Sequence, residues 1–364
     1  MIGPIAEPET ARARLLVLRH GWNATAYQIL NPGIAHWFAA SGDAVIGYAR
    51  YHGVYVVAGD PVCAAERVAG VVDEFEHEAR ANGSHVCYFG AAERFAGTLR
   101  GDTGRAFVIL GGNPVWDPAA WSSIVAHRAS VRAQLHRAVN KGVTVIEWPA
   151  ARANGHADLW RCLREWGTTR GLPPMHFLVE PRTLDRLDDR RVFVAERAGH
   201  GVAGFLLASP VPQRRGWLVE QLIRGRGAAN GTNELLVDAA MRTFAAEGAA
   251  YVTLGLSPLS RRSHLDEMVN PAWLRVVLSS VRAHGRRFYN FDGLDAFKAK
   301  LMPQGWEPVY AIADNRRVLP RTLFAVAAAF SGGSPIAFVA RAMLGAARTE
   351  AAWALGNARS TIRR

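Results

Sequence analysis

The first 120 residues carry short runs of hydrophobic positions separated by polar turns. β-Rich runs bounded by glycine or polar residues predict strands at residues 44–48, 54–57, 85–89 and 106–110. The apolar positions of residues 64–82 instead recur at intervals of three and four, which predicts an amphipathic helix. Strands that alternate with a helix in this way predict one α/β lobe.

The rest of the chain changes repeatedly between helical and strand periods. Helical spacing occurs at residues 118–140, where the pattern ends at Lys141 and Gly142, and at residues 158–169 and 232–247. Strand patterns occur at residues 143–148, 192–197, 201–209, 218–223, 251–256, 288–291 and 309–313, with a glycine-rich loop at 224–231. A strand, a hairpin, a strand, a glycine loop, a helix and a strand, in this order, are typical of the acetyltransferase-type (GNAT) fold.

These patterns predict an α/β (α+β) fold with two lobes and a helical tail; that both are GNAT-like lobes in tandem is what the family resemblance given below implies. We expect an N-terminal lobe over residues 1–120, then a basic linker helix and a second, catalytic lobe over residues 121–318. Residues 319–364 are rich in alanine and arginine and predict the tail. No repeat of identical residues supports a duplication, which is therefore inferred from the order of elements alone.

Charge separates this chain from an ordinary globular protein. Apolar residues make up 49% and charged residues 20%, but the formal net charge is +12 and the isoelectric point is about 10.3. Such an excess favours nucleic acid or anionic lipid headgroups as partners. A GC-rich genome, whose proteins carry many arginines on solvated surfaces, would give the same excess of positive charge without any such partner.

Several classes of site and of location are excluded by what the sequence lacks. The three cysteines, Cys63, Cys87 and Cys162, are scattered, which argues against a disulfide framework or a zinc site and fits a reducing compartment. We find no secretory signal and no apolar run of the ~20 residues that a spanning helix needs. We therefore expect a cytoplasmic protein, or one that is peripheral at the inner face of the plasma membrane.

Four stretches stand out because of the residue types that they combine. They read SVRAQLHRAVNKG from Ser130, ANGTNELLVDAAM from Ala229, YVTLGLSPLS from Tyr251 and FYNFDGLDAFKAKLMPQGWEP from Phe288. In this order they resemble the C-terminal catalytic domain of the phosphatidylglycerol lysyltransferases, over roughly residues 20 to 312. The resemblance implies aminoacyl transfer from aminoacyl-tRNA, a co-substrate, to a lipid, with no cofactor and no metal. The multi-pass membrane region typical of those lipid transferases is not found in this sequence.

The first stretch carries a run of basic side chains at helical spacing. Arg128 and Arg132 are four residues apart, as are Arg137 and Lys141, and no acidic residue lies between Asp117 and Glu147. We place 128, 132 and 139 on one stripe of the helix, and Val131, Leu135, Ala138 and Val139 on its buried side. A polyanion is the natural partner of such a face, and the family resemblance implies tRNA. A solvated helix face is the alternative.

The glycine-rich loop admits two enzymatic interpretations. The pattern Arg224-x-x-Gly227-x-Ala229 fits the pyrophosphate loop of coenzyme-A-dependent acetyltransferases, which would make the chain an N-acyltransferase. The resemblance instead implies that Asn230, Gly231 and Thr232 receive the charged 3′ end of tRNA. Glu234 and Asp238, four apart on one helix face, would then meet the ammonium group of the substrate. Glu234 could also simply complement the helix dipole.

The last two stretches supply the remaining candidates for the transfer site. An aminoacyl ester is already activated, so an enzyme must mainly position the acceptor and stabilise the carbonyl oxygen. Ser257 and Asn290 are candidates to hydrogen-bond the substrate, Tyr289 to bind it, and Lys298 to place a cation near a phosphate or an oxyanion. Phe291, Phe297 and Trp306 are expected in the core and Lys300 at the surface. No catalytic nucleophile is recognisable.

The tail leaves its partner open. Large apolar residues between Leu323 and Leu344 alternate with alanine and glycine and are followed by arginines. This composition suits an amphipathic segment on an anionic membrane surface. It suits equally a segment that packs on the second lobe or on a partner subunit. A basic membrane- or RNA-binding protein without catalysis, on the same fold, is the third possible function.

Overall fold

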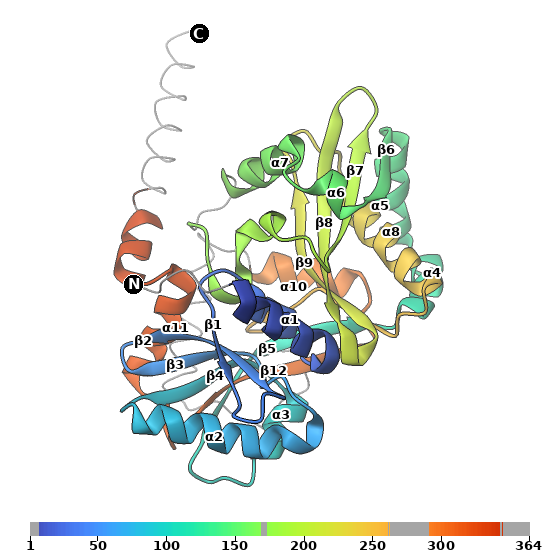
Figure 1. The fold of residues 1–364 in the computed structure, drawn as a ribbon. Coiled ribbons are helices and arrows are strands. Elements are labelled where there is room, and N and C mark those ends of the chain that lie inside the picture. Colours follow the sequence, from blue (N-terminus) through green and yellow to red (C-terminus); the bar gives the residue numbers. More distant parts are fainter. Residues whose placement is uncertain (1–6, 169–172, 261, 263–290, 343, 345–364) are drawn as a thin grey trace.

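The computed structural model describes residues 7–168, 173–260, 262, 291–342 and 344 (Figure 1). Within these residues twelve strands form one continuous sheet, in the order β1-β2-β3-β4-β12-β5-β10-β9-β8-β7-β6, with β11 paired to β5. The strands are β1 (Ala35–Phe38), β2 (Val45–Tyr51), β3 (Val54–Ala58), β4 (His85–Ala92), β5 (Ala106–Trp116), β6 (Val143–Trp148), β7 (Arg191–Arg197), β8 (Gly201–Val211), β9 (Gly216–Arg224), β10 (Tyr251–Thr253), β11 (Ser257–Pro258) and β12 (Gly305–Ala313). The mixed α/β class predicted from the sequence is confirmed.

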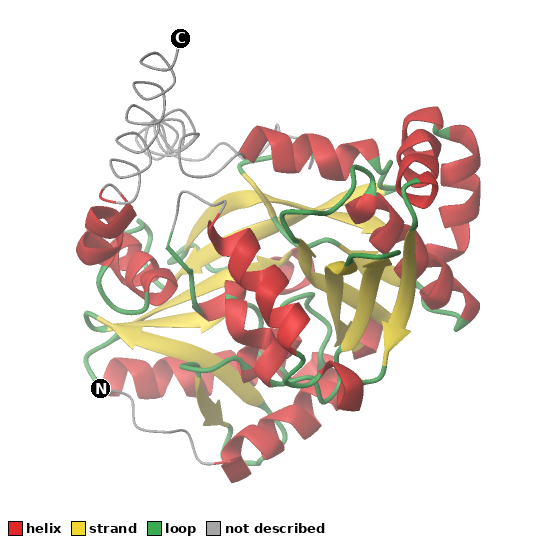
Figure 2. Cartoon of the chain, turned by 90° about the horizontal axis from the view of Figure 1, so that it is seen from above, coloured by secondary structure: helices red, strands yellow, loops and turns green. Residues whose placement is uncertain are grey.

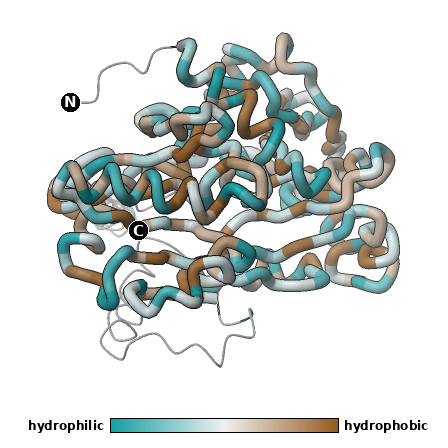
Figure 3. The backbone as a smooth tube through the Cα atoms, turned by 60° about the horizontal axis from the view of Figure 1, so that its bottom comes forward, coloured by the Kyte–Doolittle hydropathy of each residue, from teal (hydrophilic) through white to brown (hydrophobic). Residues whose placement is uncertain are grey.

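Helices cover both faces of this sheet (Figure 2). They are α1 (Glu7–His20), α2 (Val68–Ala81), α3 (Glu93–Leu99), α4 (Trp121–His127), α5 (Ala129–Asn140), α6 (Ala150–Ala153), α7 (Ala157–Thr168), α8 (Thr232–Ala246), α10 (Phe291–Lys300) and α11 (Pro320–Ser331). In α2 the residues Val71, Val72, Phe75 and Ala79 are buried, as the helical period predicts. Figure 3 shows hydrophilic and hydrophobic positions alternating along the outer helices.

Two strand–helix–strand units repeat the same arrangement in the two halves of the sheet. In the first, β3 and β4 are parallel and α2 connects them; in the second, β9 and β10 are parallel and α8 connects them. Every other pair of neighbouring strands that the structure describes is antiparallel. The antiparallel pair of β5 and β10 joins the halves, and each half contains one parallel pair of strands.

The last strand crosses between the two predicted lobes. β12 lies between β4 and β5, antiparallel to both, although about 190 residues separate it from β5 along the chain. Its Tyr310 and Ile312 belong to the core beneath α2 and α3. The N-terminal half of the sheet is therefore complete only with residues that follow position 304, while the exact lobe boundaries at 120 and 318 stay predictions.

The sequence misplaced two element boundaries. The helical region predicted at 118–140 is broken at Arg128, whose extended backbone (φ −108°, ψ 91°) separates α4 from α5. Residue 291, predicted to close a strand at 288–291, begins α10 instead, and residues 288–290 lie outside the described part of the chain. The aromatic run at 288–291 fits either a strand or a helix, whereas at Arg128 the helical period continues across the break, so periodicity fixes neither boundary.

The start of the predicted tail packs on the N-terminal half of the sheet and also contacts residues 176–178 of the predicted second lobe, where Phe330 stacks edge-on against Phe177. Ala325 and Ala329 of α11 belong to the same core as Val45, Val54 and Val56 of β2 and β3. Among the described residues no single helix has the length and apolarity to cross a membrane. One pair, Pro320–Ser331 with Pro335–Ala342, meets both criteria when taken together, although the two helices are bent by 58°.

Candidate functional site

A cavity of about 300 Å³ lies where α5 meets the start of α8. We call it the α5–α8 cavity. Its lining comprises Gln134, Arg137, Arg224, Asn230, Gly231, Asn233, Glu234 and Phe297. Four residues predicted for tRNA binding or for transfer, namely Arg137, Asn230, Gly231 and Glu234, thus line one space, although they come from two separate stretches of the chain.

Close contact between backbones brings the two helices together. Gly231 precedes α8 with φ +92°, and a Cβ atom at this position would lie 2.1 Å from the carbonyl oxygen of Gln134. Only glycine meets both demands without strain. Thr232 is fully buried, and its hydroxyl donates to the carbonyl oxygen of Ala229 at 2.7 Å. Thr232 therefore holds the loop in place and is not among the lining residues.

The two acidic residues of α8 have different surroundings. Glu234 lines the cavity, and Lys300 Nζ of α10 donates to its Oε1 at 2.5 Å. Asp238 lies outside the lining and is engaged by two donors, Trp121 Nε1 at 2.8 Å and Arg242 Nε at 2.9 Å. Of the predicted pair, only Glu234 is placed to meet a cationic group in the cavity.

Lys298 is buried beside the cavity and does not project into it. Its Nζ donates to the carbonyl oxygens of Gly255 and Leu256, at 2.8 and 3.0 Å. Burial lowers the pKa of Lys298 to about 7, against the opposing effect of Asp295. Lys298 therefore ties α10 to the turn between β10 and β11.

Ser257 follows that turn and is also buried. It is 1% exposed, and its hydroxyl oxygen has no hydrogen-bond partner among the described residues. In β11 it pairs with Gly112, and a Cβ at the neighbouring Gly111 would lie 2.1 Å from the Ser257 carbonyl oxygen. Tyr289 and Asn290, the other two residues predicted near this strand end, lie outside the described residues.

The four basic side chains of the linker do not all lie on one face of a single helix. Arg128 lies in the break between α4 and α5, and Arg132 Nη1 donates to the carbonyl oxygens of Val125 and Ala126 at the end of α4. Arg137 and Lys141 are exposed. None of the four forms an ion pair with a described residue, which leaves their charge available to an anion.

One residue of the predicted buried stripe faces outward. Val131, Leu135 and Ala138 are buried, but the Val139 side chain is 54% exposed. At about 100° per residue, position 139 lies next to 132 on the helix and away from 131, 135 and 138, so it belongs to the polar side of α5.

Four contributors to the site were missed or misplaced from the sequence. Gln134 and Asn233 were not predicted, Phe297 was assigned to the core and Lys300 to the surface. Phe297 and Lys300 are three residues apart on α10, a spacing that puts both on one side of a helix. This spacing could have indicated from the sequence that the two residues contribute to the same site. Asn233 has a buried amide oxygen without a partner among the described residues, a feature that only coordinates reveal.

The coenzyme A interpretation meets an obstacle in the glycine-rich loop. The backbone N–H of Arg226, inside the predicted pyrophosphate loop, donates to the carboxylate of Glu165 at 2.9 Å. A pyrophosphate at this loop would meet a negative charge and a backbone donor that is already engaged. Among the described residues no group of three or more His, Cys, Asp or Glu side chains could hold a metal ion.

Comparisons with known proteins identify relatives of the chain. Residues 13–313 match the family described as phosphatidylglycerol lysyltransferase, C-terminal. The chain is 25% identical over 328 residues to the phosphatidylglycerol lysyltransferase of Bacillus subtilis strain 168, covering 89% of this chain and 37% of that protein. It is 26% identical over 299 residues to the lysylphosphatidylglycerol biosynthesis bifunctional protein LysX of Gordonia bronchialis, covering 78% and 25%. The chain thus spans little more than a third of the first relative and a quarter of the second.

Solved structures share the fold along nearly the whole chain. A domain from Agrobacterium fabrum, described as the C-terminal domain of a lysylphosphatidylglycerol synthetase, superposes with a TM-score of 0.75 at 22% identity and covers 90% of this chain and 98% of its own. L-PGS from Bacillus licheniformis gives 0.72 at 21% identity, with 94% and 98% covered. The match over residues 13–313 shows that the chain belongs to the phosphatidylglycerol lysyltransferase C-terminal family.

Proposed function

We propose that this protein transfers an aminoacyl group from aminoacyl-tRNA to a hydroxyl of a lipid headgroup such as that of phosphatidylglycerol. The observation that carries the proposal is the α5–α8 cavity, in which Arg137 of the basic helix lies beside Asn230, Gly231 and Glu234 of the glycine loop and α8. The names of the two relatives, a phosphatidylglycerol lysyltransferase and a lysylphosphatidylglycerol biosynthesis protein, support the lipid acceptor.

The basic residues suit the tRNA side of the reaction. Arg128, Arg137 and Lys141 are exposed and have no acidic partner among the described residues, so each could neutralise a phosphate and release counterions. Because Arg137 also lines the cavity, the same side chain connects the tRNA-binding face with the space where the aminoacyl end would enter.

The cavity also suits the charge of an aminoacyl group. An aminoacyl ester carries an ammonium group, and Glu234 is the carboxylate that lines the cavity. Lys300 now balances its charge, and an incoming ammonium group would compete with Lys300 for it. Asn230 and Asn233 also line the cavity, and in this proposal their amide groups hydrogen-bond the polar remainder of the ester.

The chemistry asks for positioning more than for acid–base catalysis. The acceptor hydroxyl oxygen forms a bond to the aminoacyl carbonyl carbon, the bond from that carbon to the ribose oxygen breaks, and the proton moves to the ribose oxygen. One ester replaces another, so alignment of the two reactants supplies much of the rate. We place the reaction at the inner face of the plasma membrane, where tRNA and lipid headgroups meet.

The test uses the purified chain, a pool of radiolabelled aminoacyl-tRNAs and vesicles that contain phosphatidylglycerol, with and without RNase. Label that enters the lipid phase and disappears with RNase supports the proposal, and single aminoacyl-tRNAs then identify the donor. Unlabelled lipid with the tRNA ester left intact overturns it.

A pair of matched variants links the activity to the cavity. Glu234→Gln keeps the size and the hydrogen-bonding of the side chain but removes its charge, so we expect transfer to fall at least about tenfold, which corresponds to about 1.4 kcal/mol. Glu66→Gln, an exposed residue away from the cavity, is the control and should transfer as the unchanged chain does. Equal activity of both variants would remove Glu234 from the site.

A further inference from the structure

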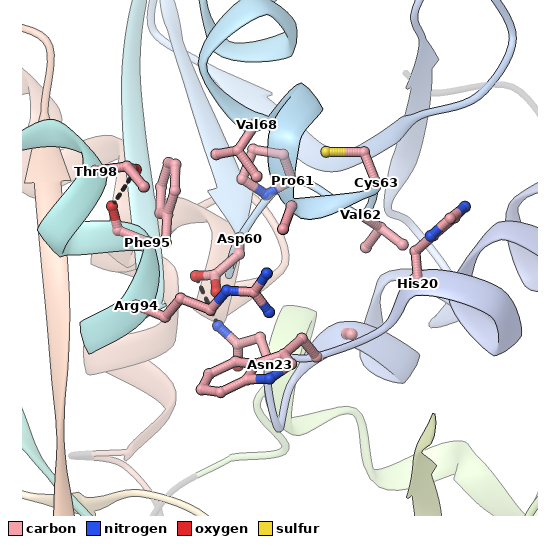
Figure 4. Close-up of a pocket in the computed structure, with 13 residues that line it drawn as sticks. His20, Asn23, Asp60, Pro61, Val62, Cys63, Val68, Arg94, Phe95 and Thr98 are labelled. Carbon is pink, nitrogen blue, oxygen red and sulfur yellow. Dashed lines mark hydrogen bonds between the residues drawn. The ribbon is translucent and has the colours of Figure 1, made fainter. Parts of the chain in front are cut away.

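A second cavity, of about 190 Å³, lies in the N-terminal half of the sheet (Figure 4). It is found where β3 ends and the chain turns towards α2, and α3 forms its opposite wall; we call it the β3–α2 cavity. Its lining includes Trp22, Asp60, Val62, Val68, Arg94 and Phe95. None of these residues takes part in the α5–α8 cavity.

Asp60 is held rigidly at the base of the β3–α2 cavity. Its Oδ1 accepts hydrogen bonds from Asn23 Nδ2 at 2.8 Å and from the backbone N–H of Ala92 at 2.9 Å. Asn23 is itself fixed, because its Nδ2 also donates to the Gly90 carbonyl oxygen at 3.0 Å. The other oxygen, Oδ2, has no hydrogen bond among the described residues. Burial raises the pKa of Asp60 to about 7, so a nearby cationic group would stabilise its ionised form.

Arg94 is the second charged residue of the β3–α2 cavity. In Figure 4 its side chain extends from α3 alongside Asp60, yet the two form no ion pair with each other, and Arg94 forms none with any other described residue. Its guanidinium lies over the Trp22 ring, 5.0 Å from the ring centre. Arg214 lies over the same ring at 4.6 Å, which fixes the indole. One carboxylate oxygen and one guanidinium are thus left to a ligand.

The place of this cavity in the fold matches that of the α5–α8 cavity. Both lie at the carboxyl end of the first strand of a parallel strand–helix–strand unit, at the approach to the helix: β3 and α2 in one half, β9 and α8 in the other. Ligands of α/β sheets bind outside the carboxyl ends of parallel strands, because strand ends and connecting loops leave space there. The fold therefore provides two equivalent positions for a ligand, with different side chains around each.

We propose that the β3–α2 cavity binds a free α-amino acid in its zwitterionic form. Asp60 Oδ2 would accept from the ammonium group, Arg94 would bind the carboxylate, and Val62, Val68 and Phe95 would surround a side chain of moderate size. This site is distinct from the proposed transfer site, because an amino acid esterified to tRNA has no carboxylate to offer Arg94. The inference goes beyond the proposed function and does not depend on it.

The test is a calorimetric titration of the purified chain with each of the twenty free amino acids. Each amino acid that binds is then compared with its N-acetyl derivative, which lacks the ammonium group, and with its amide, which lacks the carboxylate. We expect saturable binding of at least one amino acid, weakened at least about tenfold by either modification, or about 1.4 kcal/mol. Equal binding of either derivative would overturn the proposal. It would also be overturned if no amino acid bound at millimolar concentration, and a titration in which glycerol 3-phosphate binds and no amino acid does would count as the same result.

Variants locate the site. Asp60→Asn keeps an Oδ1 acceptor for Asn23 and Ala92 while removing the charge, and Arg94→Gln changes an exposed side chain without disturbing the core. Each should weaken amino-acid binding at least about tenfold. Arg137→Gln, in the other cavity, should leave it unchanged. If Asp60→Asn fails to fold, Arg94→Gln alone decides, and undiminished binding by that variant would overturn the proposal. Because the readout is binding and not transfer, its outcome is separate from that of the transfer assay.

Discussion

At the scale of single residues, Lys298 is the clearest case in which burial changes the pKa of a side chain. It is one of three lysines in the sequence, and we expected it to place a cation near a phosphate or an oxyanion. The structure buries it against two backbone carbonyl oxygens. An ammonium group removed from water loses hydration that two hydrogen bonds only partly replace, which is why its pKa falls to about 7.

This burial predicts a pH dependence of stability. The unfolded chain binds a proton at Lys298 up to about pH 10.5, whereas the folded chain releases it near pH 7. Between these values the unfolded state binds more protons, so rising pH favours the folded state. Relative to Lys298→Met, we expect the free energy of unfolding of the unchanged chain to rise by up to about 1.4 kcal/mol per pH unit.

Urea denaturation at several pH values between 7 and 10 measures this difference. Lys141→Met, which removes an exposed lysine, is the control for the loss of a lysine. If the difference in free energy of unfolding between the unchanged chain and Lys298→Met stayed constant across this range, the lowered pKa of Lys298 would be contradicted.

At the scale of elements, the approach of α8 to α5 determines whether the α5–α8 cavity forms. Gly231→Ala would place a Cβ atom 2.1 Å from the Gln134 carbonyl oxygen and keep φ at +92°. We expect a loss of about 1–3 kcal/mol in the free energy of unfolding from the backbone conformation alone, together with reduced transfer because the loop must move away from α5.

A neighbouring glycine is the matched control for this prediction. A Cβ atom at Gly227, in the same loop, would meet no atom within 4 Å, so Gly227→Ala should leave the stability unchanged or raise it slightly. Chemical denaturation of both variants makes the comparison. If both variants lost a similar free energy of unfolding, the cost of alanine in this loop would not come from the contact between α8 and α5.

Local patterns predicted most elements because they depend on neighbours in the sequence. The strands β2, β3 and β6 and the helices α2 and α8 follow the periods of their apolar residues closely. The break at Arg128 was not predictable in this way, because α4 and α5 are both amphipathic and the residue between them has ordinary helix propensity. The contribution of Phe297 and Lys300 to the cavity required knowing that α10 packs beside α8, a contact across more than 60 residues of sequence.

At the scale of the whole molecule, the positive charge predicts a strong dependence of tRNA binding on salt. The logarithm of the affinity should fall linearly with the logarithm of the salt concentration, and the slope counts the phosphates that are neutralised. Removing one phosphate contact lowers the slope by about 1. We expect this change for Arg137→Gln and for Lys141→Gln, measured by filter binding at several salt concentrations.

The control for the salt experiment is an arginine away from the basic helix. Arg182→Gln removes an exposed arginine that is paired with Asp185 and should leave the slope unchanged. Slopes that are identical in all three variants would mean that the basic helix does not contact tRNA phosphates.

The placement of β12 predicts that the N-terminal half does not fold alone. A fragment of residues 1–120 would lack β12, the strand that joins β4 to β5, and would also lack β10 and β11, so one edge of β4 and both edges of β5 would be unpaired. We expect this fragment to be aggregated or unfolded by circular dichroism, whereas the complete chain unfolds cooperatively. A soluble, folded fragment would show that β4 and β5 need no strand between them.

The position of β12 also has a consequence for synthesis on the ribosome. The residues of β5 leave the exit tunnel about 190 residues before those of β12, which at roughly 5–20 residues per second is an interval of about 10–40 s. Throughout that interval the nascent chain carries hydrophobic strands whose final neighbour has not yet been translated. Such a chain is a natural client for ribosome-associated chaperones. Slow translation downstream of β5 would lengthen the time for which these strands lack their final neighbour.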